Sequence, residues 1–465
     1  MSRSIVKKLA FIVLACFVLS FAFAGCGAKT ETKEEPAAST EPKEEPKKEE
    51  PKKEEPKAEP VKIVYWMFGD PTIEAEKGLP KEKWYITGAI ERFEKANPDI
   101  KVELLILPQD GLGEKFKASG IAQNGPDITN LWVGAMLSDN KQFILPLDKY
   151  FTADDLKNVG GELAVRLGYD TQGPLMGMPS GNDSLVMFYN KAMFKAAGVD
   201  EGALPKTMDE LYAVCEKIKA TGKTPMVFGD KEGYYSAFMM LPIYASVTGA
   251  QGLRDIIEGK TTFSGDPNFI ATAKAWQDLY KKGYTNKDVA SLDDSGAQSK
   301  FANGGAAIIS TGQWLIPSAL ATLKDDLGMM KIPSLTADAK YPGTIVGGPG
   351  QCYVVTSYSK YPDQAVKFMK FLISKEEEET KITQREHGTG ATPYKYVSPD
   401  VFTDPFSKQL QEFSKDSLLI PWMDNQLPAE VAAEFYRLSP LLLSAKMTPE
   451  EYAKKLDEQM QKVAK

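Results

Sequence analysis

The sequence has few of the residues on which most enzyme chemistry depends. It contains one histidine, His387, among 465 residues. A Ser–His–Asp or Cys–His site would have to use that single residue, and a zinc site built on several histidines is impossible. His387 lies in the stretch 385–390, which is typical of a loop after a helix, where a histidine commonly interacts with the helix dipole. We therefore expect no histidine-based catalysis.

Cysteines are almost as scarce, with four in the chain and no Cys-x-x-Cys pair. Cys215 falls on the apolar side of a predicted helix, and Cys352 begins a predicted strand. Both positions are typical of small buried hydrophobic residues. A disulfide between the two stays open at this level. No metal-ligand spacing is present, so we expect neither a metal nor a cofactor.

A basic stripe is also missing. The net charge is −7 at pH 7, and the body of the chain is acidic. An acidic body argues against nucleic acid as a partner. The N-terminal segment cannot belong to a packed core, which leaves about 400 residues. A single hydrophobic core usually supports fewer residues than this. We therefore expect two lobes.

The first 25 residues have the pattern of an export signal. Basic residues precede the apolar run 9–19, which is too short to span a membrane. The run ends in Phe23-Ala24-Gly25-Cys26, which resembles the lipobox of bacterial lipoproteins, although Phe23 stands where Leu or Val is preferred. We expect residues 1–25 to be a signal peptide and Cys26 the lipid anchor. The alternative is a secreted protein cleaved near Ala24.

Residues 26–60 consist largely of Glu, Lys and Pro, in repeats such as Glu41–Pro46. The segment offers almost no apolar surface to bury, and this composition predicts a disordered, extended chain. With the rise of a polyproline II helix it would reach on the order of 100 Å. We expect a tether that holds the folded body away from a membrane, as suits a thick-walled, Gram-positive cell.

Alternating strand and helix patterns indicate an α/β body. The first region predicts strands and helices in turn at 61–68, 85–96, 100–107, 113–123 and 128–133. This order predicts a parallel sheet with right-handed crossovers. Ligands gather at the carboxyl ends of such strands, where Trp66, Asp70 and Trp132 lie.

The same alternation returns in a second region. Its predicted elements are a strand at 185–190, a helix at 190–197, a helix with a Thr207/Glu210 capping box, a strand at 225–228 and a helix after Gly233. Two α/β regions of this kind predict two lobes with a cleft between them.

From Trp66 to about Pro421 the chain resembles the family 1, maltose-binding-protein-like, extracellular solute-binding proteins. Five short motifs carry the resemblance, and they occur in the family's order. They are Gly177–Ser180 with Phe188–Phe194, Pro205–Leu211 with Met208 in place of Trp, Phe301–Ile308 with Thr311–Trp314, Gly347-Gly348, and the helix 363–374.

The resemblance implies an α/β, two-lobed periplasmic-binding-protein (Venus flytrap) fold, class II-like, with discontinuous lobes and a hinge of about three crossing segments. Lobe 1 would comprise residues 61–183 plus 345–393, and lobe 2 residues 184–344 plus 394–465. The crossings would fall near 181–184, 343–348 and 392–394.

The resemblance also implies a carbohydrate site. Trp314 stands where the family places a tryptophan that stacks on sugar, and Trp132 matches an aromatic position in the other lobe. Asp183, at the first crossing, matches a carboxylate that accepts hydrogen bonds from sugar hydroxyls. Pyranose faces present C–H groups that pack on aromatic rings, which is why such sites use tryptophan. Core packing is the alternative for each tryptophan.

Further candidates follow from position. Trp66 and Asp70 end the first predicted strand. The resemblance places Gly348 and Gly350 at the second crossing, where glycine allows close backbone approach, and Trp422 in a region that contributes ligand contacts late in the sequence. Tyr234 or Tyr235 begins a helix at the cleft rim, and the sequence does not decide between them.

The implied function is to bind a carbohydrate between the lobes and deliver it to the permease subunits of an ABC transporter, without catalysis. We expect a monomer, attached to the membrane only through its lipid, that closes by a hinge motion. One alternative is a binding protein of the same fold for a polyamine, a peptide or a metal chelate. The other is an extracellular carbohydrate hydrolase that uses two carboxylates.

Overall fold

The computed structural model describes residues 59–68, 76, 78–108, 111–159, 165–166, 173–384 and 394–463. The predicted signal peptide, the anchor Cys26 and nearly all of the tether lie outside these residues, as do Asp70, His387 and most of the predicted crossing at 392–394. Residues 58–465 form one compact unit. Among the described helices, none has both the length and the apolar composition that a membrane crossing requires.

The first sheet has five strands in the order β2-β1-β3-β9-β4. They are β1 (Val61–Phe68), β2 (Ile100–Leu107), β3 (Ile128–Trp132), β4 (Met178–Pro179) and β9 (Gln351–Val355). Strands β1, β2 and β3 run parallel, and β9 is antiparallel to β3 and β4. The predicted alternation of the first region, with its parallel sheet, is confirmed.

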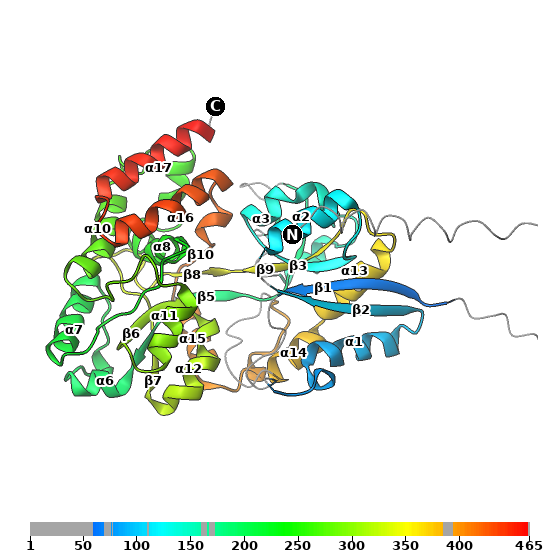
Figure 1. Cartoon of the computed structure of the whole chain (residues 1–465), viewed down its shortest axis with the longest axis horizontal. Coiled ribbons are helices and arrows are strands. Elements are labelled where there is room, and N and C mark those ends of the chain that lie inside the picture. Colours follow the sequence, from blue (N-terminus) through cyan, green and yellow to red (C-terminus); the bar gives the residue numbers. More distant parts are fainter. Residues whose placement is uncertain are drawn as a thin grey trace, which may run out of the picture. The chain divides into compact units, whose positions relative to one another are not determined.

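Helices flank this sheet. They are α1 (Tyr85–Ala96), α2 (Leu112–Ala122), α3 (Ala135–Asp139), α4 (Ala153–Lys157), α13 (Pro362–Leu372) and α14 (Lys375–Gln384). Figure 1 shows α2 and α3 on one side of the strands and α1 and α14 on the other. Ile86, Ile90 and Phe93 place the apolar stripe of α1 in the first core. We call this sheet and its core the first lobe.

The second sheet has the order β10-β8-β5-β6, with β7 also paired to β5. Its strands are β5 (Asp183–Asn190), β6 (Ile308–Gly312), β7 (Leu327–Met330), β8 (Ile345–Gly348) and β10 (Leu419–Ile420). One buried cluster contains Met187 and Tyr189, and a second contains Val186 and Phe188, as alternation along β5 requires. We call this sheet and its cores the second lobe.

The second lobe is rich in helices. They are α6 (Lys191–Ala196), α7 (Met208–Ala220), α8 (Tyr234–Thr248), α9 (Gln251–Ile257), α10 (Pro267–Lys281), α11 (Asp294–Ala302), α12 (Ile316–Leu323), α15 (Pro405–Lys415), α16 (Ala429–Leu443) and α17 (Pro449–Val463). Short 3₁₀ turns lie between elements, at η2 (Lys81–Lys83), η3 (Lys141–Phe143), η4 (Glu201–Ala203), η5 (Gln313–Leu315), η6 (Lys324–Asp326), η7 (Pro399–Val401) and η8 (Met423–Asn425).

The start of α7 follows the predicted cap in part. Thr207 Oγ1 accepts the Glu210 backbone N–H at 3.2 Å, as expected of an N-cap. The Glu210 carboxylate accepts the backbone N–H of Lys206, at 2.6 Å, one residue before the expected partner. The helix therefore begins where the sequence predicts.

The strand predicted at 225–228 is wrong. Met226 makes only an isolated bridge with Ile308. The Val227 N–H still donates to the Ile308 carbonyl at 3.0 Å, but the Phe228 N–H leaves the ladder and donates to the side chain of Asn286, at 2.8 Å. A short apolar run has the pattern of a strand in sequence, but here it pairs with β6 only at Ile308, and a loop and a side chain provide its other partners.

The chain crosses between the sheets where β4 ends at Pro179 and β5 begins at Asp183, which confirms the first predicted crossing. The second crossing lies between Gly348 and Gln351, because β8 still pairs with β5 through Asp183 and Gly348. Residues 345–348, expected in the first lobe, therefore belong to the second sheet. Figure 1 shows β5 and the β8–β9 run side by side between the sheets.

The third crossing falls later than predicted. Tyr394 and Phe402 are buried in the first core, and Leu410 is the next residue buried in a core of the second lobe. The hydroxyl of Tyr394 donates to the Pro179 carbonyl at 2.7 Å, which holds the segment on β4. Residues 394–402, expected in the second lobe, therefore pack with the first.

Candidate functional site

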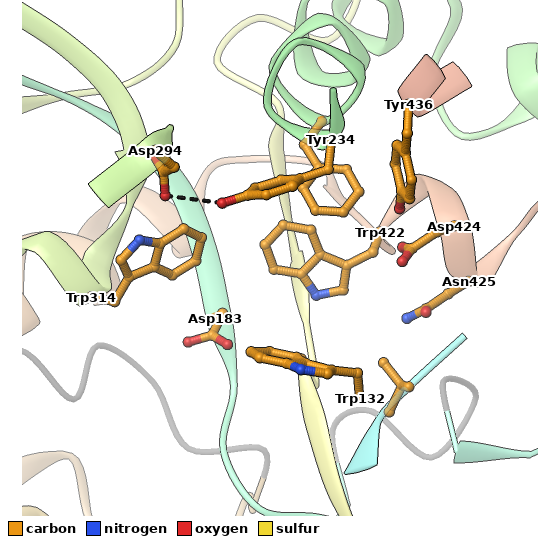
Figure 2. A pocket seen from close by; sticks show the side chains of 12 residues that line it. Trp132, Asp183, Tyr234, Asp294, Trp314, Trp422, Asp424, Asn425 and Tyr436 are labelled. Carbon is orange, nitrogen blue, oxygen red and sulfur yellow. Dashed lines mark hydrogen bonds between the residues drawn. The ribbon is translucent and has the colours of Figure 1, made fainter. Parts of the chain in front are cut away.

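A cavity of about 600 Å³ lies where the two lobes meet. This volume is within the range of small-molecule sites. The first lobe and the two crossings contribute Trp132, Val133, Asp183 and Gly350. The second lobe contributes Tyr234, Phe238, Asp294, Trp314, Trp422, Asp424, Asn425 and Tyr436. Figure 2 shows these side chains around the cavity.

Three tryptophans line the cavity from three separate segments of the chain. Trp132 is the last residue of β3, at the carboxyl end of a parallel strand, and it is half-buried. Trp314, in η5, is 39% exposed, which is rare for so large an apolar side chain unless it serves a surface role. Trp422 is buried, and its Nε1–H donates to the Gly348 carbonyl at 3.1 Å. Trp314 therefore offers ring surface, whereas Trp422 is held in place.

Four rings form an aromatic wall, which we define as Tyr234, Phe238, Trp422 and Tyr436. The ring of Phe238 is central: its centroid lies 5.7 Å from that of Tyr234, 5.2 Å from Trp422 and 6.0 Å from Tyr436. The rings are tilted or edge-on, the arrangements that aromatic quadrupoles favour. The wall brings α8, α16 and the segment before η8 to one side of the cavity.

Three carboxylates reach the cavity from separate segments. Asp183 begins β5, Asp294 begins α11, and Asp424 lies in η8. Asp183 Oδ1 accepts the side-chain amide of Gln313 at 3.0 Å. The hydroxyl of Tyr436 donates to Asp424, and burial raises the pKa of Asp424 to about 6.

Asp294 is the most enclosed of the three, with 8% exposure. Its Oδ2 accepts the hydroxyl of Tyr234 at 3.2 Å (Figure 2) and the amide of Gln298 at 2.6 Å. Its Oδ1 has no hydrogen-bond partner among the described residues. Burial raises the pKa of Asp294 to about 6, against the lowering effect of those two hydrogen bonds.

Asn425 also has two polar side-chain atoms without a hydrogen-bond partner among the described residues. These atoms, Oδ1 and Nδ2, are buried. Gly134 makes room for this side chain, since a β-carbon there would lie 2.6 Å from Asn425 Oδ1. A buried polar atom without a partner costs about 1–3 kcal/mol. Asp294 and Asn425 thus both line the cavity and both keep enclosed polar atoms that no described residue satisfies.

The structure brings together most of the residues predicted from sequence. Trp132, Asp183, Tyr234, Trp314, Trp422 and Gly350 all line the cavity. Gly348 does not line it, but its carbonyl holds Trp422. Trp66 is half-buried against Phe68, with ring centroids 6.2 Å apart, and lies outside the lining.

Tyr235 is a core residue and not a second lining tyrosine. It is 2% exposed, and its hydroxyl donates to the carbonyl of Ser310. Of the two tyrosines that the sequence left open, Tyr234 is the one that lines the cavity.

Sequence reasoning missed six lining residues: Val133, Phe238, Asp294, Asp424, Asn425 and Tyr436. Asp424 and Asn425 follow Trp422 within three residues, so their nearness to a candidate was a usable signal. Asp294 follows the N-cap Asp293, where an acidic residue normally serves the helix dipole, and so carried no separate signal.

Within the described ranges, no three His, Cys, Asp or Glu side chains gather so as to hold a metal ion. Cys215 and Cys352 are free and buried in the cores of different lobes, which settles the open question of a disulfide. Burial raises the pKa of both thiols.

Comparison with known proteins gives a family and a set of relatives. The family model described as "Bacterial extracellular solute-binding protein" matches residues 79–379. The chain is 24% identical over 424 residues to the maltooligosaccharide ABC transporter solute-binding lipoprotein of Streptococcus pneumoniae serotype 4, covering 88% of each. It is 26% identical over 302 residues to the sn-glycerol-3-phosphate-binding periplasmic protein of Salmonella paratyphi A, covering 62% of this chain and 66% of that protein.

Solved structures share the fold. A chitin oligosaccharide binding protein superposes with a TM-score of 0.71 at 22% identity, covering 87% of this chain and 98% of that one. The GacH receptor of Streptomyces glaucescens gives 0.69 at 22% identity, again covering 87% and 98%. These matches agree with the two-lobed α/β architecture described above.

Proposed function

This chain belongs to the bacterial extracellular solute-binding protein family, and we propose that it captures a carbohydrate in the cavity between its lobes and delivers it to the permease of an ABC transporter. The observation that carries the proposal is the pair of Trp132 and Trp314 on the lining, one from each lobe, with carboxylates beside them. Relatives named as maltooligosaccharide-binding lipoproteins of ABC transporters support the same class of ligand.

The chemistry of the lining fits a sugar. The apolar faces of pyranose rings pack on indoles, and Trp314 exposes its ring for such a contact. Hydroxyl groups both donate and accept, so they suit a lining that combines carboxylates, tyrosine hydroxyls and the amide of Asn425. A sugar that contacts Trp132 and Trp314 together binds both lobes at once, and this stabilises the closed form over the open one.

The lining fits a polyamine less well. A polyamine site needs carboxylates in excess, whereas here Asp183, Asp294 and Asp424 are matched by three tryptophans. Asp294 and Asp424 also each accept a tyrosine hydroxyl already, which leaves less of each carboxylate for an ammonium group. We propose binding without turnover, in keeping with a family of binding proteins.

We also propose that Cys26 carries a lipid and that residues 26–60 tether a monomeric body to the outer face of the membrane of a Gram-positive cell. The support is the sequence pattern together with relatives named as lipoproteins. The test is labelling of growing cells with a radioactive fatty acid. We expect label on the wild-type protein and none on Cys26→Ser, which should also be released into the medium.

A ligand screen tests the proposed function. The Cys26→Ser protein is melted alone and with maltotriose, xylotriose, chitotriose, raffinose, spermidine or glycine. A ligand at a hundred times its Kd adds about 2.7 kcal/mol, which raises Tm by several degrees. We expect at least one sugar to raise Tm, with the shift lost in Trp314→Ala and no release of reducing sugar. A shift with spermidine alone would overturn the carbohydrate proposal.

A further inference from the structure

The relatives leave the charge of the ligand open. One is named for a maltooligosaccharide, which is neutral, and another for sn-glycerol-3-phosphate, which is an anion. The charges of the side chains that line this cavity distinguish between a neutral and an anionic ligand. Building on the proposed carbohydrate function, we infer that the cavity accepts uncharged sugars and excludes sugars that carry a carboxylate or a phosphate.

The first step is the sign of the charge around the cavity. Asp183, Asp294 and Asp424 approach it from β5, α11 and η8, and the lining contains no lysine or arginine among the described residues. An anion that leaves water for such a site loses its hydration without gaining a countercharge. It would also lie beside carboxylates of the same sign, which is the repulsive element that specificity commonly uses.

The second step is the geometry at Asp294. Its Oδ2 is occupied by Tyr234 and Gln298, which fix the carboxylate in one orientation. Its Oδ1 is enclosed by protein, with almost no surface open to a ligand, and has no partner within the described chain. The side chain lines the cavity and is the most enclosed of the three carboxylates, so water screens its charge least and an anionic ligand is repelled there most strongly. Asp294 is therefore the residue on which the selectivity chiefly depends.

The third step concerns the neutral donors that could favour an anion. Asn425 Nδ2 is such a donor, but it belongs to a neutral amide beside Asp424. The indole N–H of Trp422 is already used by the Gly348 carbonyl, at 3.1 Å. Neither group supplies the positive charge that favours binding of a phosphate or a carboxylate.

The test compares neutral and anionic probes by calorimetric titration at pH 8. The neutral probes are maltotriose, xylotriose and raffinose, and the anionic probes are trigalacturonate, glucose 6-phosphate and sn-glycerol 3-phosphate. We expect at least one neutral probe to bind and every anionic probe to bind at least a hundredfold more weakly. An anionic sugar that binds as tightly as the best neutral one overturns the charge inference and leaves the carbohydrate function standing. Spermidine binding without any sugar overturns the carbohydrate function, and this inference with it.

Asp294→Asn shows whether Asp294 sets the selectivity. We expect the ratio of neutral to anionic affinity to fall about tenfold, because the amide keeps the shape and removes the charge. Asp209→Asn is the matched control, since Asp209 is exposed on α7, outside the lining, and the change in net charge is the same. If Asp294→Asn does not fold, Asp424→Asn tests the same prediction. A ratio unchanged in both cavity variants would contradict the assignment.

Discussion

The indole of Trp314 lies directly against Gly312, so that a β-carbon on Gly312 would fall 1.9 Å from the ring atom Cζ3. Gly312 has φ −90°, a conformation open to any residue, so the ring and not the backbone requires glycine here. The residue between them, Gln313, donates from its amide to the Asn182 carbonyl at 2.8 Å and to Asp183 at 3.0 Å. The short turn at Gln313 therefore fixes the positions of both Trp314 and Asp183 at the cavity.

Gly312→Ala should weaken sugar binding without unfolding the protein. The added methyl group cannot share space with the indole, so Trp314 must leave its position. We expect the affinity for the sugar found in the screen to fall at least tenfold in calorimetric titration, with a small change in Tm. Gly113→Ala is the control, because its β-carbon would meet Met136 at an ordinary 3.5 Å. If Gly312→Ala bound the sugar with wild-type affinity, the position of the Trp314 ring would not matter for binding.

Tyr234→Phe and Tyr235→Phe should affect different properties. Loss of the Tyr235 hydroxyl leaves the buried Ser310 carbonyl without its partner, which should lower the free energy of unfolding by about 1–3 kcal/mol. Loss of the Tyr234 hydroxyl frees Asp294 and should lower sugar affinity severalfold. Urea titration and calorimetry measure the two effects. The reverse pattern would place Tyr235, and not Tyr234, at the ligand.

Trp422→Ala should destabilise the protein far more than Trp314→Ala, although both should weaken binding. Trp422 is 5% exposed and contacts Phe238, whereas Trp314 is 39% exposed. Removing a buried aromatic side chain costs about 3–5 kcal/mol. The comparison is made by urea unfolding of the three proteins without ligand. Equal losses of stability would mean that Trp314 is also a core residue.

Stability should fall as the pH rises from about 4 to about 7, with Asp230 as one cause. Asp230 is fully buried, and burial raises its pKa to about 7, although the backbone N–H of Ser236 donates to it at 3.0 Å. The folded protein holds a proton that the unfolded chain has released, since an unfolded aspartate has a pKa of about 3.9. The resulting stability is complete below that value and is lost as the pH passes through 7.

Asp230→Asn should flatten this pH dependence, because the amide does not titrate. We expect unfolding free energies at pH 5 and pH 8 to differ less in the variant, by an amount on the order of a few kcal/mol. Urea unfolding at the two pH values measures the difference. If the unfolding free energies of the two proteins changed equally between pH 5 and pH 8, Asp230 would not titrate in this range.

Much of the fold could be predicted because local patterns and tertiary structure agree. The alternation in 61–68 and 100–107 matches β1 and β2, and Thr207 marks the start of α7. Trp314 could be predicted as a site residue because a large ring after a glycine turn has little room in a core. These features depend on a few neighbouring residues.

The rest of the site depends on how elements dock. Helix α8 is apolar almost all round, so its periodicity cannot say whether Tyr234 or Tyr235 faces the core. Tyr436 lies on α16 and is an ordinary half-buried residue until Asp424 is placed beside it. The late third crossing was missed for the same reason, since Tyr394 joins the first lobe through a contact with Pro179.

The pairing of β3 with β9 has a consequence for the order in which the protein folds. Ile128 lies opposite Val355 in the first sheet, and the intervening chain builds most of the second lobe. Contacts so distant in sequence require a long loop to close, and this slows folding. During synthesis the first lobe cannot complete its sheet until residue 355 has left the ribosome. A chain exported before that point would enter its translocation channel without a completed first sheet.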